Sequence, residues 1–347
     1  MSGKRNALVR RQFLKASGAT ALAGLAGCLS SAGSQEAQAS LAGDTDAVED
    51  PVDVKVFVLA AFEVAKLKKR ENGDAPGEFQ LWYDGYDLTT EADVPGAFAP
   101  VYYNDEGVAG TITGIGKSNT AGSLSAILRS PKFDFEDTYF VTAGISGSPP
   151  SVGTLGSVFV SEAVADWDLL HRWSRADGPA DPHAMMLRPH RPDHAFELNN
   201  DLVERASTLA EGVTLTDSER AKEYRALYDE EVAQSEPFVG VGTTLCGDTY
   251  WHGETFSAQA QHIVDEYDVG TYATTEMEDF ATATVLKRYG LLDRYVSIRS
   301  VSNFDQPHPG QTVEESLAAD SGGFAPSVEN VYRVGSALVD DLLDREC

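Results

Sequence analysis

From residue 52 onward, short apolar runs alternate with longer amphipathic runs along the chain. The first pair is the apolar run at residues 54–59 and the amphipathic stretch at residues 62–70. Short buried strands and amphipathic helices bury their apolar surfaces together when the strands form a sheet and the helices cover it. The alternation therefore predicts an α/β fold with three layers, α/β/α, around a mixed central sheet.

The same alternation predicts the remaining elements. Strands are expected at residues 108–113, 138–142, 157–161, 238–241, 271–274 and 295–298, and helices at residues 120–129, 200–209, 218–233, 257–267, 276–289 and 326–343. Residues 166–196 fit neither pattern, so we interpret them as an irregular insertion. Three histidines lie between residues 167 and 192 without regular metal-ligand spacing, so we expect no metal site. No cofactor is predicted either.

The first residues have the pattern of an export signal. Arg10 and Arg11 precede an apolar run that ends at Cys28. The run has about 14 residues, whereas a membrane-spanning helix needs about 20. We interpret residues 1–27 as a twin-arginine lipoprotein signal peptide, with lipidation of Cys28 anchoring the protein on the outer face of the cytoplasmic membrane. An uncleaved anchor or a disordered tail is the alternative.

Residues 28–51 are rich in Ser, Ala, Gly, Asp and Glu and predict a flexible acidic tether, followed by one domain at residues 52–347. The formal net charge of the chain is −27. This charge excludes nucleic acid as a ligand and is typical of a protein adapted to molar salt, where charges are screened within about 3 Å. The remaining cysteines, Cys246 and Cys347, are too few for a disulfide framework.

Two glycine-rich segments follow predicted strands. Gly114 and Gly116 precede Lys117, where a helix begins, and Gly144 and Gly147 flank Ser146 in a predicted turn. Glycines at such places let backbone amides approach a ligand, and a helix N-terminus favours negative charge. Each segment is a weak signal by itself, because a tight strand-to-helix turn has the same glycines.

A third motif is more informative. Glu276-Met277-Glu278 opens a helix after one predicted strand, and Ser302-Asn303 follows the next. Both motifs, with the two glycine segments and Gly247-Asp248-Thr249-Tyr250, resemble those of nucleoside phosphorylases and of methylthioadenosine nucleosidase. A narrower resemblance, to the purine nucleoside permease family, covers residues 54–343 and includes Ser302-Asn303-Phe304-Asp305.

The resemblance implies a nucleoside phosphorylase-like fold, a purine nucleoside as ligand and a homo-oligomer. It implies that Met277 packs on the ribose, that Glu278 binds the ribose hydroxyls, that Tyr250 stacks on the base, and that Ser146, with the amides near Gly144, faces the ribose or an attacking group. Taken singly, Glu278 could instead be a first-turn helix charge, Met277 core filling and Tyr250 a half-buried aromatic. Their joint order along the chain favours the binding roles.

Two residues bear on catalysis. Asn303 stands where the nucleosidases have an aspartic acid that protonates adenine, and its amide suits the edge of a 6-oxopurine. Glu63 is the carboxylate expected to activate a water. Thr142 stands where the bacterial phosphorylases have an arginine, which makes a phosphate site doubtful.

Two functions follow from these features. The first is a surface protein that binds a purine nucleoside and delivers it to a separate membrane transporter. The second is an extracytoplasmic nucleoside hydrolase, or less readily a phosphorylase, that cleaves the N-glycosidic bond. Asn303 and Glu63 are the catalytic candidates for the second function.

Overall fold

The structure is a computed structural model that describes residues 50–64, 67, 76–174, 185–187 and 194–345. The chain forms two compact units, Met1–Val48 and Glu49–Cys347, and the first lies wholly outside the described residues. The predicted signal peptide, Cys28, nearly all of the tether and Cys347 are therefore not described. None of the described helices is long and apolar enough to cross a membrane.

The second unit consists of strands, helices and one 3₁₀ turn. The strands are β1 Val52–Asp53, β2 Val56–Ala60, β3 Thr90–Ala92, β4 Val101–Tyr103, β5 Val108–Ile112, β6 Phe133–Asp134, β7 Tyr139–Ser148, β8 Val158–Asp166, β9 Leu170–Arg172, β10 Met185–Leu187, β11 Ala195–Glu197, β12 Val239–Cys246, β13 Tyr272–Glu276 and β14 Tyr295–Phe304. The helices are α1 Gln80–Gly85, α2 Lys117–Leu128, α3 Asn200–Ala210, α4 Glu219–Arg225, α5 Glu231–Gln234, α6 Glu254–Tyr267, α7 Asp279–Tyr289, α8 Val313–Ala318 and α9 Phe324–Arg345, with the 3₁₀ turn η1 at Leu292–Arg294.

The main sheet is mixed. Its strand order is β11-β8-β12-β13-β7-β2-β5-β4-β3, and β14 pairs in parallel with β7 and antiparallel with β8. Strands β8, β12, β13, β7 and β14 thus close a circuit within the sheet. Strand β2 lies between β5 and β7 in parallel pairing, and all of its residues are buried, as expected for a central parallel strand.

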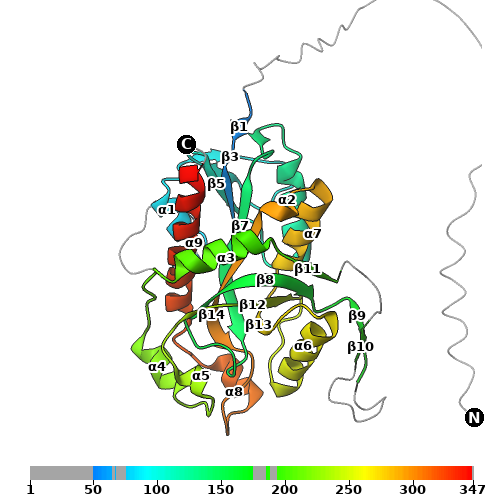
Figure 1. The fold of residues 1–347 in the computed structure, drawn as a ribbon, viewed down its shortest axis with the longest axis vertical. Helices are drawn as coiled ribbons and strands as arrows, with labels where there is room; N and C mark the ends of the chain where they lie inside the picture. Colours follow the sequence, from blue (N-terminus) through cyan, green and yellow to red (C-terminus); the bar gives the residue numbers. More distant parts are fainter. Residues whose placement is uncertain (1–49, 65–66, 68–75, 175–184, 188–193, 346–347) are drawn as a thin grey trace, which may run out of the picture. The chain divides into compact units, whose positions relative to one another are not determined.

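Helices cover both faces of this sheet (Figure 1). Helix α9 contacts β7, β14 and β2, and it also contacts α1 and α3. On the opposite side, α2 packs against α7, and α7 contacts β8 and β12. The arrangement confirms the predicted α/β fold with a mixed central sheet.

Two predicted helices differ from the structure. Residues 61–64 and 67 are not helical, and the rest of the segment predicted at residues 62–70 lies outside the described residues. The helix predicted at 218–233 is divided into α4 and α5. Between them Tyr228 is buried, its ring centroid lies 4.2 Å from that of Phe304, and its hydroxyl donates to the Gln306 carbonyl. These tertiary contacts override the helical pattern.

Several strands run further than predicted, and the extensions of β7 and β14 build the site. Gly144–Gly147 was predicted as a turn, which is wrong, because β7 continues through Ser148. Strand β14 likewise continues to Phe304, and the pairing places Val301 opposite Ser146 and Asn303 opposite Gly147. Backbone pairing with the neighbouring strand extends both strands beyond their apolar residues.

The described part of the predicted insertion, residues 166–196, is more regular than expected. Strands β9 and β10 pair antiparallel as a separate two-stranded sheet, and β11 joins the edge of the main sheet beside β8. Residues 175–184 and 188–193 lie outside the described part of the chain.

Candidate functional site

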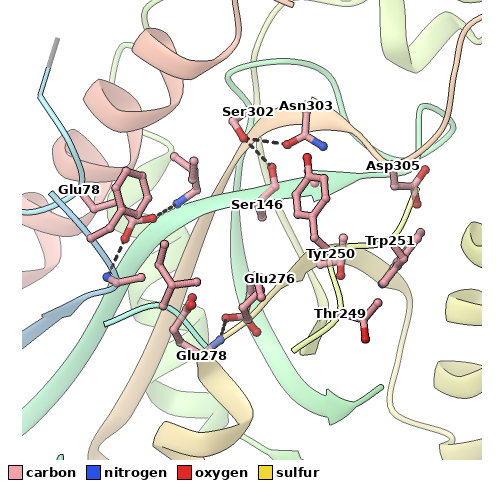
Figure 2. A pocket seen from close by; sticks show the side chains of 17 residues that line it. Glu78, Ser146, Thr249, Tyr250, Trp251, Glu276, Glu278, Ser302, Asn303 and Asp305 are labelled. Atoms are coloured by element: carbon pink, nitrogen blue, oxygen red, sulfur yellow. Dashed lines mark hydrogen bonds between the residues drawn. The ribbon is translucent and has the colours of Figure 1, made fainter. Parts of the chain in front are cut away.

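A cavity of about 240 Å³ opens where β7, β13 and β14 end beside the loop at residues 249–251. Its lining combines apolar and aromatic side chains with carboxyl groups (Figure 2). The lining residues are Ala61, Phe62, Glu78, Ile115, Ile145, Ser146, Gly147, Thr249, Tyr250, Trp251, Thr275, Glu276, Met277, Glu278, Ser302, Asn303 and Asp305. Five of the residues predicted from the sequence are among them: Ser146, Tyr250, Met277, Glu278 and Asn303.

The β7–β14 pairing fixes the polar wall of the cavity. The Ser146 hydroxyl donates to the Ser300 carbonyl at 3.1 Å, and the Ser302 hydroxyl lies 3.0 Å from Asn303 Oδ1. Asn303 Nδ2 donates to the Phe304 carbonyl at 3.0 Å. Since a side-chain amide has two N–H donors and two acceptor lone pairs, one of each remains for a ligand.

Arg299 is the buried cation beneath this wall. It forms two hydrogen bonds with Asp279, and its guanidinium lies 2.8 Å from Glu276 Oε2 and 3.7 Å from Glu278 Oε2. Burial raises the pKa of Asp279, but the Arg299 charge and the hydrogen bonds to the carboxylate together outweigh burial and hold that pKa below its usual value. Burial raises the pKa of Glu276 to about 8 and that of Glu278 to about 7. A single guanidinium does not balance three buried carboxylates, so some of these carboxyl groups are protonated near neutral pH.

Glu276 and Glu278 are held differently. Glu276 Oε2 accepts hydrogen bonds from the Glu278 and Asp279 amides at the start of α7, while its buried Oε1 has no partner. Glu278 Oε1 accepts from the Gly116 amide at 2.9 Å. The glycine segment predicted to approach a ligand thus anchors a cavity carboxylate instead.

Gly144 does not line the cavity, although the sequence placed it in the site. It lies against the carboxyl cluster, where a Cβ would come within 2.5 Å of the Arg299 guanidinium and 2.7 Å of Glu78 Oε1. Gly144 is therefore needed for the close packing of these two charged groups against β7.

Glu63 also lies outside the cavity lining. Its Oε1 accepts from the amides of Val64 and Gly77, and its Oε2 accepts from the Gln80 amide. Three backbone donors occupy the carboxylate predicted to activate water. Its contacts are those of a group that holds the loop before α1 in place.

Glu78, which the sequence did not indicate, supplies the buried carboxyl on this side of the cavity. Its two oxygens accept from the Ala61 amide at 2.7 Å and the Ile145 amide at 2.8 Å. Burial raises its pKa, against the opposing effect of Arg299. No sequence pattern separates Glu78 from its acidic neighbours, because its position depends on contacts with residues 61 and 145.

Asp305 is a second cavity carboxyl that was not singled out. Its Oδ2 accepts from the hydroxyls of Ser257 and Tyr272, and its buried Oδ1 has no partner. Residues two apart on an extended chain face the same side, so the position of Asp305 two residues after Asn303 was a signal for it. In Figure 2, Asp305 and Trp251 lie on one side of the cavity, and Glu78 and Glu278 on the other.

Among the described residues, no Lys or Arg lines the cavity. Lys117, which follows the glycine segment, pairs with Asp166 at 3.1 Å and Asp168 at 2.7 Å. The Thr142 hydroxyl is paired with that of Tyr295. The described lining is therefore unsuited to an anion such as phosphate, and its unpaired carboxyl oxygens suit an uncharged ligand with hydrogen-bonding groups.

Other proteins of known structure share the fold that forms this cavity. The chain resembles the 5′-methylthioadenosine/S-adenosylhomocysteine nucleosidase of Streptococcus pneumoniae with a TM-score of 0.55 and 17% identity, covering 83% of this chain and 100% of that structure. It also resembles the futalosine hydrolase of Helicobacter pylori with a TM-score of 0.53 and 17% identity, covering 83% and 98%. The fold is that of the nucleoside phosphorylases and nucleosidases.

Sequence comparison narrows the class to a family. The sequence model of the purine nucleoside permease family matches residues 53–346. The chain is 32% identical to a probable purine nucleoside permease of Schizosaccharomyces pombe, over 67% of this chain and 74% of that protein. It is 28% identical to the purine nucleoside permease of Candida albicans, over 83% and 75%. The chain belongs to the purine nucleoside permease family.

Proposed function

We propose that the cavity binds a purine nucleoside. The lining of the cavity carries the proposal: within the described part of the chain, it combines aromatic and aliphatic side chains with four carboxyl side chains and no cationic one. A nucleoside matches this lining, because it is uncharged and joins a flat aromatic base to a sugar with adjacent hydroxyl donors. The names of the related permeases and the fold shared with nucleosidases support the same ligand.

In this proposal, Glu278 binds the ribose hydroxyls, Met277 packs on the ribose, and Tyr250 stacks on the base. The Tyr250 side chain is 65% exposed at the cavity, so a bound base would cover an aromatic face that is now open. Glu276 Oε1, which is buried and without a partner, is a second carboxyl oxygen that can form a hydrogen bond with the ligand. Ser146 lies between these groups and Asn303.

We propose nucleoside uptake as the biological role, with the protein delivering its ligand to a separate membrane transporter. A homo-oligomer in molar salt, exported and lipid-anchored, is part of this proposal. Mass spectrometry of the membrane-associated protein should find a modified Cys28 as the first residue. A cytosolic protein that retains Met1 would contradict export and anchoring.

Hydrolysis of the N-glycosidic bond is the second candidate function. It is favoured by Glu78, a buried carboxyl with a raised pKa that suits proton transfer with a water and that, unlike Glu63, lines the cavity. Phosphorolysis has less support, because the cavity lining has no cation for phosphate.

One experiment separates these functions. The full-length protein is incubated in molar salt with inosine, guanosine, adenosine or uridine, with and without phosphate. Binding is measured by calorimetric titration, and free base, ribose and ribose 1-phosphate are measured by chromatography. Purine nucleoside binding without products supports uptake, ribose supports hydrolysis, and ribose 1-phosphate supports phosphorolysis. If no purine nucleoside binds and none is consumed, the proposed ligand is wrong.

Base preference is a further expectation for this site. The Asn303 amide donates and accepts hydrogen bonds but does not act as a general acid, so inosine and guanosine should bind better than adenosine, by about 1 to 3 kcal/mol where a buried group is left unpaired. Asn303→Asp should shift the preference toward adenosine. Calorimetric titration of the three nucleosides against both proteins tests this, and an unchanged rank order would mean that Asn303 does not contact the base.

A further inference from the structure

Asp305 is held in the cavity wall by four hydrogen bonds. Its amide donates to the Ser148 carbonyl at 2.9 Å, and its carbonyl accepts from the Gly253 amide at 2.8 Å. Its Oδ2 accepts from Ser257 at 2.8 Å and from Tyr272 at 2.9 Å. Three elements, β7, α6 and β13, and the loop before α6 therefore fix the direction of the carboxyl group.

The other oxygen, Oδ1, is the unusual atom. It is buried, it has no hydrogen-bond partner, and the residue is only 1% exposed while lining the cavity. Leaving a buried polar atom unpaired is costly, so such an atom in a cavity points to a ligand that completes its hydrogen bonding. Asp305 has no ion pair among the described residues, in contrast to the carboxyl cluster around Arg299.

The hydrogen bonds at Oδ2 define the chemistry at Oδ1. Both donors to Oδ2 are hydroxyl groups, and no cation balances a negative charge on the carboxyl group. A buried carboxyl in such surroundings favours its neutral form, and burial raises the pKa of Asp305 to about 7. With Oδ2 acting as the acceptor, the proton of the neutral acid resides on Oδ1, which becomes a buried donor of a residue that lines the cavity.

We propose that Asp305 recognises the base of a bound 6-oxopurine nucleoside. Its Oδ1 hydroxyl donates a hydrogen bond to N7 or O6 on the edge of the base. This inference rests on the proposed nucleoside function. Asp305, Asn303 and Trp251 line the same cavity, and in Figure 2 Asp305 lies across from Glu278, the proposed ribose contact. Hydrogen bonds with Ser302 and Phe304 already occupy part of the Asn303 amide. Asp305 therefore supplies a further hydrogen-bond donor for the base.

The test compares inosine with two analogues, 7-deazainosine, which lacks N7, and purine riboside, which lacks O6. Calorimetric titration of the wild-type protein should show at least one analogue binding about tenfold or more weakly than inosine. If both analogues bind as tightly as inosine, the proposal is overturned without any variant. If inosine itself does not bind, the proposed function fails instead.

Two variants test whether Asp305 acts as a hydrogen-bond donor or as a negative charge. In Asp305→Asn the amide oxygen can accept from Ser257 and Tyr272 while Nδ2 keeps a donor toward the cavity, so inosine should bind within about threefold of wild type. Asp305→Ala removes the donor, so inosine should bind about tenfold or more weakly than it binds to wild type. This variant should no longer prefer inosine to the analogue that binds weakly to wild type. A loss in Asp305→Asn as large as that in Asp305→Ala would overturn the donor role.

Ser257→Ala is the matched control. It removes one of the two hydroxyls from Oδ2 and leaves Oδ1 in the cavity, so the preference for inosine over the discriminated analogue should remain. Circular dichroism and thermal unfolding establish that each variant is folded. If Asp305→Ala does not fold, the comparison of the analogues in wild type and Asp305→Asn still decides, because a preference lost in the asparagine variant contradicts the proposal.

Discussion

Replacing Arg299 by methionine should lower the free energy of unfolding by about 3 to 5 kcal/mol, the cost of removing one partner from a buried ion pair. Arg299 is 2% exposed, and it holds Asp279, Glu276 and Glu278 together. Without it, the carboxylate of Asp279 has no cation in a buried site. The loss should persist in molar salt, because a buried pair is screened much less than a surface pair.

Urea unfolding in molar salt measures this effect. Arg333→Met is the matched control, since Arg333 forms an exposed pair with Glu329 at 2.9 Å, and its loss should cost no more than about 1 kcal/mol. In Arg299→Met, Asp279 should take up a proton at a higher pH than in wild type, so the loss should be smaller at about pH 5 than at about pH 8. Equal stability of wild type and Arg299→Met at neutral pH would show that the charge cluster is not held by Arg299.

Replacing Glu278 by glutamine should weaken the binding of ribonucleosides by about 1.5 to 3 kcal/mol for each charged hydrogen bond lost, or roughly 10- to 100-fold. The amide oxygen of glutamine can still accept from the Gly116 amide, so the cavity should keep its shape. Free bases do not contact this residue in the proposed binding mode. Their affinity should therefore change little.

Calorimetric titration of inosine, 2′-deoxyinosine and hypoxanthine against both proteins checks this prediction. Wild type should prefer inosine to the deoxy analogue, and Glu278→Gln should lose most of that preference. Because burial raises the pKa of Glu278 to about 7, the carboxylate is lost as the pH falls through that value, and inosine affinity should fall with it in wild type only. Equal losses for nucleoside and free base would mean that Glu278 has only a structural role.

The sequence alone was sufficient for the fold class and the family. Apolar runs such as residues 54–59 become buried strands in almost any context that supplies neighbours, so β2 could be predicted from its residues. The motifs around Met277 and Asn303 lie next to strands in the chain itself, which is why local patterns located them. Five of the predicted site residues consequently line one cavity.

The tertiary structure decided the lengths of the strands and the roles of the acids. Pairing with β14 extends β7 through Gly144–Gly147, where the residues alone indicate a turn. Glu63 and Glu78 are both acids near the start of the domain, and backbone amides bind both. Only Glu78 lines the cavity, because the loop to α1 brings it against residues 61 and 145.

The role of Asp305, on the other side of the cavity, also could not be predicted from the sequence alone. The chain fixes its place two residues after Asn303, but only the packing of Ser257 and Tyr272 against Oδ2 leaves Oδ1 unpaired. Local sequence determined which segments become strands and helices, since that depends on neighbours along the chain. The pairing of distant segments determined which carboxyl groups are buried, which have a raised pKa and which line the cavity, because desolvation and hydrogen bonding depend on three-dimensional surroundings.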